Sequence, residues 1–157
     1  DALRHGLRDG RLDIVATDHA PHLLTEKEGN AITAASGAPM VRYSLPVMLE
    51  LADMGVFSRE LVVEKMCHAP ARLYNIDRRG YLRSGYYADL VVVRPDDPYT
   101  VTDASASARC GWTPLAGTTL HNRVVRTYVN GHLVCSDGVV DTSVRGRELH
   151  YLPRNRG

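Results

Sequence analysis

The sequence predicts a mixed α/β fold, with helices and one buried strand in the first half and a small antiparallel β module in the second. Two patterns support this prediction. In residues 1–76, apolar side chains recur at helical spacing on both sides of a short β-branched run at 12–17. Past Ile76 the apolar period changes to two, and turn signals separate the alternating runs. We therefore expect an αβ unit with further helices, followed by hairpins.

The first αβ unit begins with a helical stripe in residues 1–8, which Gly10 ends. The run 12–17 that follows is typical of a strand buried on both faces of a parallel sheet. It stops abruptly at the polar Asp18, and Pro21 cannot continue a strand ladder. In α/β barrels the chemistry lies just past the carboxyl ends of such strands, so this turn is the first candidate for a site.

Residues 23–43 are rich in small residues and turn formers, which predicts a long loop. Ser44 is expected to cap the next helix, which ends before Gly55. Ser58 is expected to start a further helix. The segment 68–70, His-Ala-Pro, should break that helix before one more short helical turn.

The β module is expected to contain strands at 88–93, 123–129 and 132–135. Asn130-Gly131 between the last two is a strong signal for a type I′ hairpin. Residues 95–120 are rich in turn formers and are expected to be mostly irregular.

Composition narrows the class of protein. The net charge is +1 with scattered basic residues, which gives no reason to expect nucleic acid or a membrane as partner. No apolar run approaches the roughly 18 residues of a membrane span. Cys67, Cys110 and Cys135 are too far apart for a CxxC site or a disulfide framework, which favours a cytoplasmic location. The chain opens at Asp1 within a helical pattern, and we expect it to be a piece of a longer protein.

Asp18, His19 and His22 form a polar cluster directly after the expected buried strand. Carboxylate and imidazole are good zinc ligands and are the usual proton carriers near neutral pH. A structural turn remains the alternative, because an Asp after a strand is often a cap and His-x-x-His pairs arise by chance. The other histidines form no HxH or HExxH pattern, so the sequence does not contain a complete metal centre.

Five segments together resemble the dihydroorotases, within the metal-dependent amidohydrolase superfamily. Residues 15–22, VATDHAPH, resemble the motif on the last barrel strand of that family. Residues 70–74, 80–93 and 125–131 resemble the helix start and the β-module strands that follow the barrel. Residues 112–117, WTPLAG, resemble a segment found in dihydroorotases and allantoinases. The resemblance covers all but about the last dozen residues.

The resemblance implies an α/β fold: the C-terminal portion of a (β/α)8 TIM-barrel amidohydrolase plus most of a small appended β-sandwich. Residues 1–76 would supply the last barrel strand and the C-terminal helices, 77–145 the sandwich module, and 146–157 a tail. Most metal ligands would lie on upstream strands that this sequence does not contain. The intact protein is expected to be a cytoplasmic homo-oligomer, a dimer, that acts on a small-molecule substrate.

The implied activity is the reversible, zinc-dependent hydrolysis of the cyclic amide of (S)-dihydroorotate to N-carbamoyl-L-aspartate in de novo pyrimidine biosynthesis. One or two zinc ions are expected. Asp18 would be a metal ligand and the catalytic proton shuttle, and His22 would bind the substrate carboxylate. Backbone groups near Ala38, Pro39 and Met40 would also contact substrate, although this loop departs from the pattern of many relatives.

Three alternatives stay open at this point. One is a cyclic amidohydrolase of the allantoinase or hydantoinase type, whose motifs usually lack the second histidine, here His22. Another is a catalytically inactive amidohydrolase-like scaffold, against which the retained Asp18 and His22 argue. The last is a free-standing β module, which the expected buried strand 12–17 disfavours because such a strand needs neighbours on both sides.

Overall fold

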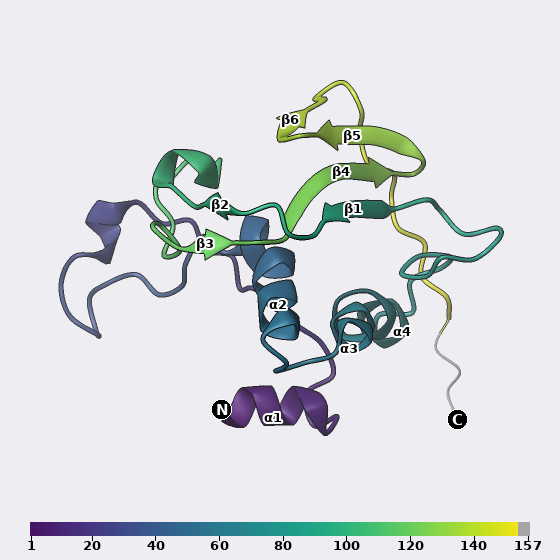
Figure 1. The fold of residues 1–157 in the computed structure, drawn as a ribbon, viewed down its shortest axis with the longest axis horizontal. Helices are drawn as coiled ribbons and strands as arrows, with labels where there is room; N and C mark the ends of the chain where they lie inside the picture. The colour runs from purple at the N-terminus through teal and green to yellow at the C-terminus, as the bar shows by residue number, and fades with distance from the viewer. Residues whose placement is uncertain (154–157) are drawn as a thin grey trace.

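The computed structural model describes residues 1–153 and separates into a helical half and a β half (Figure 1). The helices lie on one side of the larger sheet, with α1 farthest from it (Figure 1). Their bounds are α1 Ala2–Arg8, α2 Ser44–Asp53, α3 Arg59–Val63 and α4 Ala69–Leu73, with a π-helical turn at Glu64–His68 between the last two. The expected helix over 1–8 is therefore present, and Gly10 follows its end with a positive φ of 81°.

The expected antiparallel β module is also present. Its larger sheet has the order β1-β4-β5-β6, and a separate two-stranded sheet pairs β2 with β3. The bounds are β1 Leu90–Arg94, β2 Tyr99–Thr100, β3 Thr119–Leu120, β4 Arg123–Val129, β5 His132–Ser136 and β6 Val139–Val140. Asn130 and Gly131 both have positive φ, 52° and 82°, as a type I′ turn requires. The short pair β2–β3 lies within 95–120, where no strand was expected, because two-residue strands leave no periodic pattern.

Residues 12–17 do not form the strand that the sequence predicts. They are held by single contacts instead: the amide of Val15 donates to the carbonyl of Lys65 at 3.1 Å, and Lys65 Nζ donates to the carbonyl of Leu12 at 2.5 Å. A buried parallel strand needs hydrogen-bonded neighbours, and none of the described residues supplies one. The apolar pattern of a buried strand is therefore present at 12–17, but the neighbouring strands that would hydrogen-bond to it are not among the described residues.

The two expected serine caps have different outcomes. Ser58 caps α3, because its Oγ accepts from the amide of Leu61 at 3.1 Å. Ser44 does not cap α2; it is the first residue of that helix, and its Oγ donates to a carbonyl in the preceding turn. A 3-10 turn at Val41–Tyr43 leads directly into α2, so the backbone is already helical where a cap would be needed.

The segment 68–70 does not break the helix. The chain passes from α3 through the π-helical turn into α4, so that one helical stretch runs from Arg59 to Leu73. A proline inside an α-helix removes one hydrogen bond and clashes with the preceding turn. The wider π turn directly before Pro70 relaxes both constraints, which explains why the helix continues.

Two small apolar clusters form the core. The first consists of Met48 from α2, Phe57 from the connection that follows it and Val62 from α3, and this cluster holds the helices together. The second consists of Tyr43, Val101 and Leu120, and it joins the start of α2 to the β2–β3 pair. Helix α2 therefore contacts the other helices through one cluster and the smaller sheet through the other.

Much apolar surface is left open along β1. Val91 and Val92, which point to opposite faces of the sheet, are 49% and 42% exposed. A groove of about 660 Å³ runs between the helices and β1, and its apolar lining includes Leu45, Leu49, Val62, Met66, Leu90 and Val93. The apolar face of a sheet is normally buried against another layer of structure. The face of β1 that lines this groove is therefore incompletely packed within the described residues.

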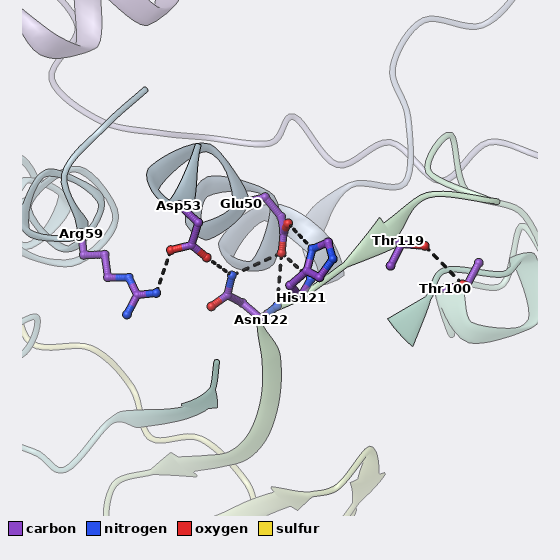
Figure 2. A network of polar contacts seen from close by, with 7 residues as sticks. All are labelled: Glu50, Asp53, Arg59, Thr100, Thr119, His121 and Asn122. Carbon is purple, nitrogen blue, oxygen red and sulfur yellow. Dashed lines mark hydrogen bonds and ion pairs between the residues drawn. The ribbon is translucent and has the colours of Figure 1, made fainter. Parts of the chain in front are cut away.

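A polar network fixes the junction of β3 and β4 to α2 (Figure 2). Asn122 is only 2% exposed, and its Nδ2 donates to Glu50 Oε1 at 3.2 Å and to Asp53 Oδ2 at 2.6 Å. Glu50 also accepts the backbone amides of His121 and Asn122 and contacts His121 Nδ1 at 2.9 Å. Arg59 binds the other oxygen of Asp53 at 2.7 Å, which brings the start of α3 into the same network.

The network also fixes the charge state of its two carboxylates. Burial raises the pKa of the Glu50 carboxyl, but hydrogen bonds from His121 and Asn122 together outweigh burial and lower it below its ordinary value. The pKa of Asp53 is lowered by the hydrogen bond from Asn122 and then by Arg59. A lowered pKa in the folded state means that this stabilisation is complete above the ordinary carboxyl pKa and is lost as pH falls through the folded value.

The tail expected at 146–157 is partly ordered against the end of the helical half. The amide of Asp77 donates to the carbonyl of His150, and the amide of Leu152 donates to the carbonyl of Asn75, both at 2.8 Å. Residues 154–157 of the expected tail lie outside the described part.

We predict that Glu50→Ala lowers the free energy of unfolding of the intact protein by about 2–4 kcal/mol, because the amides of His121 and Asn122 lose their acceptor and Asn122 Nδ2 keeps only Asp53. Chemical denaturation at neutral pH measures this. Glu148→Ala is the matched control, because Glu148 is exposed and has no side-chain partner among residues 1–153, and it should change stability by less than about 0.5 kcal/mol. The difference between Glu50→Ala and the wild type should shrink below about pH 4. Equal effects of the two substitutions at neutral pH would contradict the role given to the network.

Candidate active-site corner

The polar turn after residues 12–17 has an unusual backbone. Asp18 has a positive φ of 45°, the left-handed region that non-glycine residues rarely enter. Aspartate is among the residues that tolerate this conformation best, and its cost is about 1–2 kcal/mol. Its side chain is exposed and has no hydrogen-bond partner among the described residues. Six other non-glycine residues among 1–153 also have a positive φ, so this conformation indicates a turn at Asp18 and does not by itself mark a site.

A second segment, 37–41, lies alongside this turn. His19 and Ala38 form an isolated parallel bridge, and the amide of Ala20 donates to the carbonyl of Ala38 at 3.2 Å. The amide of Val41 donates to His19 Nδ1, also at 3.2 Å. The long loop at 23–43 thus returns to the turn at Asp18, and its last part is fixed there by hydrogen bonds from both sides.

The return of the loop depends on a close approach at Gly37. This glycine has a φ of +90°, and a Cβ added to it would lie 2.5 Å from the Cβ of Ala20. Lys27 closes the loop from the other side, because its Nζ donates to the carbonyl oxygens of Ala35 and, at 2.8 Å, of Gly37. The position therefore needs both the backbone freedom and the small size of glycine.

His22 is half-buried and is held mainly through its backbone. The indole Nε1 of Trp112 donates to the carbonyl of His22 at 2.8 Å, across 90 residues of sequence. The ring Nδ1 of His22 lies 3.8 Å from Glu26 Oε2, and that same oxygen accepts the amide of Leu23 at 2.6 Å. Glu26 and Trp112 thus fix the main chain around His22.

The structure brings the sequence-predicted site residues into one corner. Ala38 pairs with the Asp18–His19 end of the turn, Pro39 is buried beside it and Met40 is half-buried. His22 lies at the other end of the turn, under Trp112. The geometry therefore agrees with a shared site, although it does not by itself assign a role to any of these residues.

A complete metal centre is not among the features of this corner. No group of three or more His, Cys, Asp or Glu side chains comes together in residues 1–153. Asp18 fits the requirement for one ligand, because it presents an exposed carboxylate without a side-chain partner in the described residues. A metal held here would need its remaining ligands from elsewhere.

Sequence reasoning did not identify the residues that hold the corner together. Trp112 attracted attention only as part of the segment 112–117, and its bond to His22 carries no local sequence signal. Gly37 and Lys27 lie within the loop expected at 23–43, and no local sequence pattern indicates that they contact each other.

Comparisons with known proteins agree with one another. The model of the amidohydrolase family matches residues 1–134. A dihydroorotase from Halobacterium salinarum is 41% identical over 74% of the chain, and one from Syntrophus aciditrophicus is 40% identical over 85%. The chain covers 28% and 31% of those two proteins, so it spans about three tenths of the length of the curated relatives it matches.

Solved structures share the fold. An L-hydantoinase (dihydropyrimidinase) from Arthrobacter aurescens matches 89% of the chain with a TM-score of 0.82 and 30% identity, over 32% of its own length. A dihydropyrimidinase from Brevibacillus agri matches 88% with a TM-score of 0.81 at 19% identity, again over 32% of its length. The mixed α/β arrangement of this chain therefore corresponds to about one third of the length of each of these two enzymes. Among residues 1–153, no helix is both long and apolar enough to cross a membrane.

We predict that Trp112→Phe loosens the turn around His22, because it keeps an aromatic ring but removes the donor to the His22 carbonyl. Loss of such a bond costs about 1 kcal/mol, which corresponds to about fivefold more frequent local opening. Limited digestion of the intact protein with a glutamate-specific protease measures cleavage at Glu26 and Glu28. Cleavage at Glu148, far from the turn in sequence, is the internal control. Unchanged cleavage at Glu26 and Glu28 would contradict the role given to Trp112.

Proposed function

Because the chain belongs to the amidohydrolase family, we propose that it is the C-terminal part of a dihydroorotase. The proposed reaction is the reversible hydrolysis of the cyclic amide of dihydroorotate to N-carbamoyl-L-aspartate, a step of pyrimidine biosynthesis. The observation that carries the proposal is the pairing of the Asp18–His22 turn with residues 38–41, in a chain that is 41% identical to a curated dihydroorotase. The activity requires the remainder of the protein.

We propose that residues 1–76 complete a (β/α)8 barrel, that 77–145 form most of a β-sandwich and that 146–157 form a tail. Two features of the structure support a larger assembly. Residues 12–17 have the composition of a buried strand but no strand neighbour among the described residues, and β1 carries an exposed valine on each face of the sheet, Val91 and Val92. Barrel strands and a second sheet from the remainder of the protein would cover both surfaces.

We propose that Asp18 serves both as one ligand of one or two zinc ions and as the proton carrier. The chemistry that zinc supplies when bound is Lewis acidity toward the ring amide. In hydrolysis, the Asp18 carboxylate would accept at Oδ the proton of the water that adds to the ring carbonyl carbon. It would pass that proton to the ring nitrogen as the carbon–nitrogen bond breaks, and the order reverses for ring closure. Its exposed position and lack of a side-chain partner in residues 1–153 leave it available for this transfer.

We propose that His22 donates a ring N–H to the substrate carboxylate, and that backbone groups of Ala38, Pro39 and Met40 contact the substrate beside it. A charge-assisted donor suits a carboxylate better than a neutral one. A homodimeric state and a cytoplasmic location are carried over from the resemblance to the family.

A hydantoinase-type activity is the second candidate. The observation that favours it is the match to the L-hydantoinase from Arthrobacter aurescens, at 30% identity and a TM-score of 0.82. His22 favours dihydroorotate instead, because hydantoin lacks the carboxylate that this histidine would bind.

We predict that Asp18→Asn in the intact protein reduces kcat for dihydroorotate by at least about a thousandfold, because asparagine keeps the shape but cannot carry the proton. Steady-state hydrolysis measures the loss, and thermal unfolding checks that the variant folds. Asp13→Asn, five residues upstream, is the matched control and should stay near wild-type activity. Full activity of Asp18→Asn would refute its role as proton carrier.

We predict that His22→Ala raises KM for dihydroorotate by about 10- to 100-fold with a smaller effect on kcat, because it removes a charge-assisted bond of about 1.5–3 kcal/mol. Dihydrouracil, which has the ring without the carboxylate, should be hydrolysed equally by the variant and the wild type. His132→Ala, at an exposed position in β5, serves as the control. An equal loss with both substrates would argue against a carboxylate contact at His22.

A further inference from the structure

The imidazole of His19 connects the two segments of the corner by a side-chain contact. Its Nδ1 accepts the amide of Val41 at 3.2 Å, across 22 residues of sequence. A backbone contact lies beside it, from the amide of Ala20 to the carbonyl of Ala38. The two bonds therefore enclose residues 38–40, one bond at each end.

Val41 is a position where an external acceptor is needed. It is the first residue of the 3-10 turn Val41–Tyr43, and the first amides of a helical turn have no partner within the turn. No residue of the turn itself supplies a side-chain cap at this end. His19 fills that place from a distant part of the sequence, so it determines where the turn begins and where α2 leaves the loop.

The loop needs such a restraint because it is long and contains little regular structure. Between residues 23 and 40 the structure has only one short 3-10 turn, at Leu24–Lys27. Ordering a residue without other support costs about 1–2 kcal/mol in backbone entropy. Lys27 and Gly37 hold the middle of the loop, while His19 holds the end that carries the backbone groups proposed to contact substrate.

We infer that His19 is a positioning residue, whose Nδ1 holds the amide of Val41 and thereby fixes the backbone of residues 38–40 for contact with the substrate beside His22. The inference deepens the proposed function and rests on it. A direct role in chemistry is not required, because the Nδ1 lone pair is occupied by the Val41 amide. In a neutral ring the proton is then on Nε2.

Two amide substitutions test this contact with matched size and polarity. In His19→Asn, Oδ1 is bonded to Cγ as Nδ1 is in histidine, so an acceptor stays within reach of Val41. In His19→Gln the acceptor lies one carbon farther out, and in His19→Ala it is absent. The asparagine variant should therefore keep the contact, and the other two should lose it.

The first measurement is hydrogen exchange at the Val41 amide in the intact protein, which does not depend on activity. Exchange should be at least about fivefold faster in His19→Gln and His19→Ala than in the wild type, and near the wild-type rate in His19→Asn. Peptides from β4 and β5 should exchange at the same rate in all four proteins. Should His19→Ala fail to fold, the asparagine and glutamine variants decide the test by themselves.

The second measurement is steady-state kinetics with dihydroorotate. The glutamine and alanine variants should raise KM by about fivefold or more with kcat within about twofold, and asparagine should restore KM. The inference is overturned if asparagine behaves like alanine in exchange, if no variant changes exchange, or if kcat falls while KM is unchanged. If the wild type does not hydrolyse dihydroorotate, the proposed function fails, and with it the role of His19 in substrate binding. Hydrogen exchange then still decides whether His19 holds the Val41 amide.

Discussion

The arrangement of this chain depends on the carboxylate of Glu50. One side chain of α2 accepts two backbone amides and a buried asparagine at the junction of β3 and β4 (Figure 2). A buried polar group without a partner costs about 1–3 kcal/mol, so these bonds favour the position of the junction against α2. Asp53 and Arg59 extend the same contact to α3. The helical half and both sheets therefore meet at a hydrogen-bonded network rather than at a large apolar interface.

Both segments of the candidate corner are connected to this network. On one side α2 continues backward through the turn Val41–Tyr43 into the loop that lies beside His19. On the other side, β2 and β3 flank the stretch that carries Trp112, whose indole holds the main chain of His22. Tyr43 packs with Val101 and Leu120 between the two routes. The position of the corner relative to the sheets is thus set by α2, and its internal geometry is set by His19 and Trp112.

The sequence was informative where a signal is local. The hairpin at Asn130-Gly131, the cap at Ser58 and the antiparallel β module follow from turn chemistry and periodicity, and the structure confirms them. The expected strand at 12–17 was wrong for the described residues because apolar periodicity reports what a segment could bury, not whether a neighbour is present. The motif around Asp18 and His22 identified the corner through family resemblance. The contacts that build it join residues 22 and 90 positions apart, and no pattern within one segment can reveal them.

The central claim is that this corner binds the carboxylate end of a cyclic amide substrate. A crystal structure of the intact protein with bound dihydroorotate tests it most directly. The account predicts the substrate carboxylate within hydrogen-bond distance of the His22 ring, backbone groups of residues 38–40 in contact with the substrate, and the Asp18 carboxylate beside the ring amide. A substrate carboxylate bound elsewhere, with His22 and residues 38–40 free of contact, would contradict it.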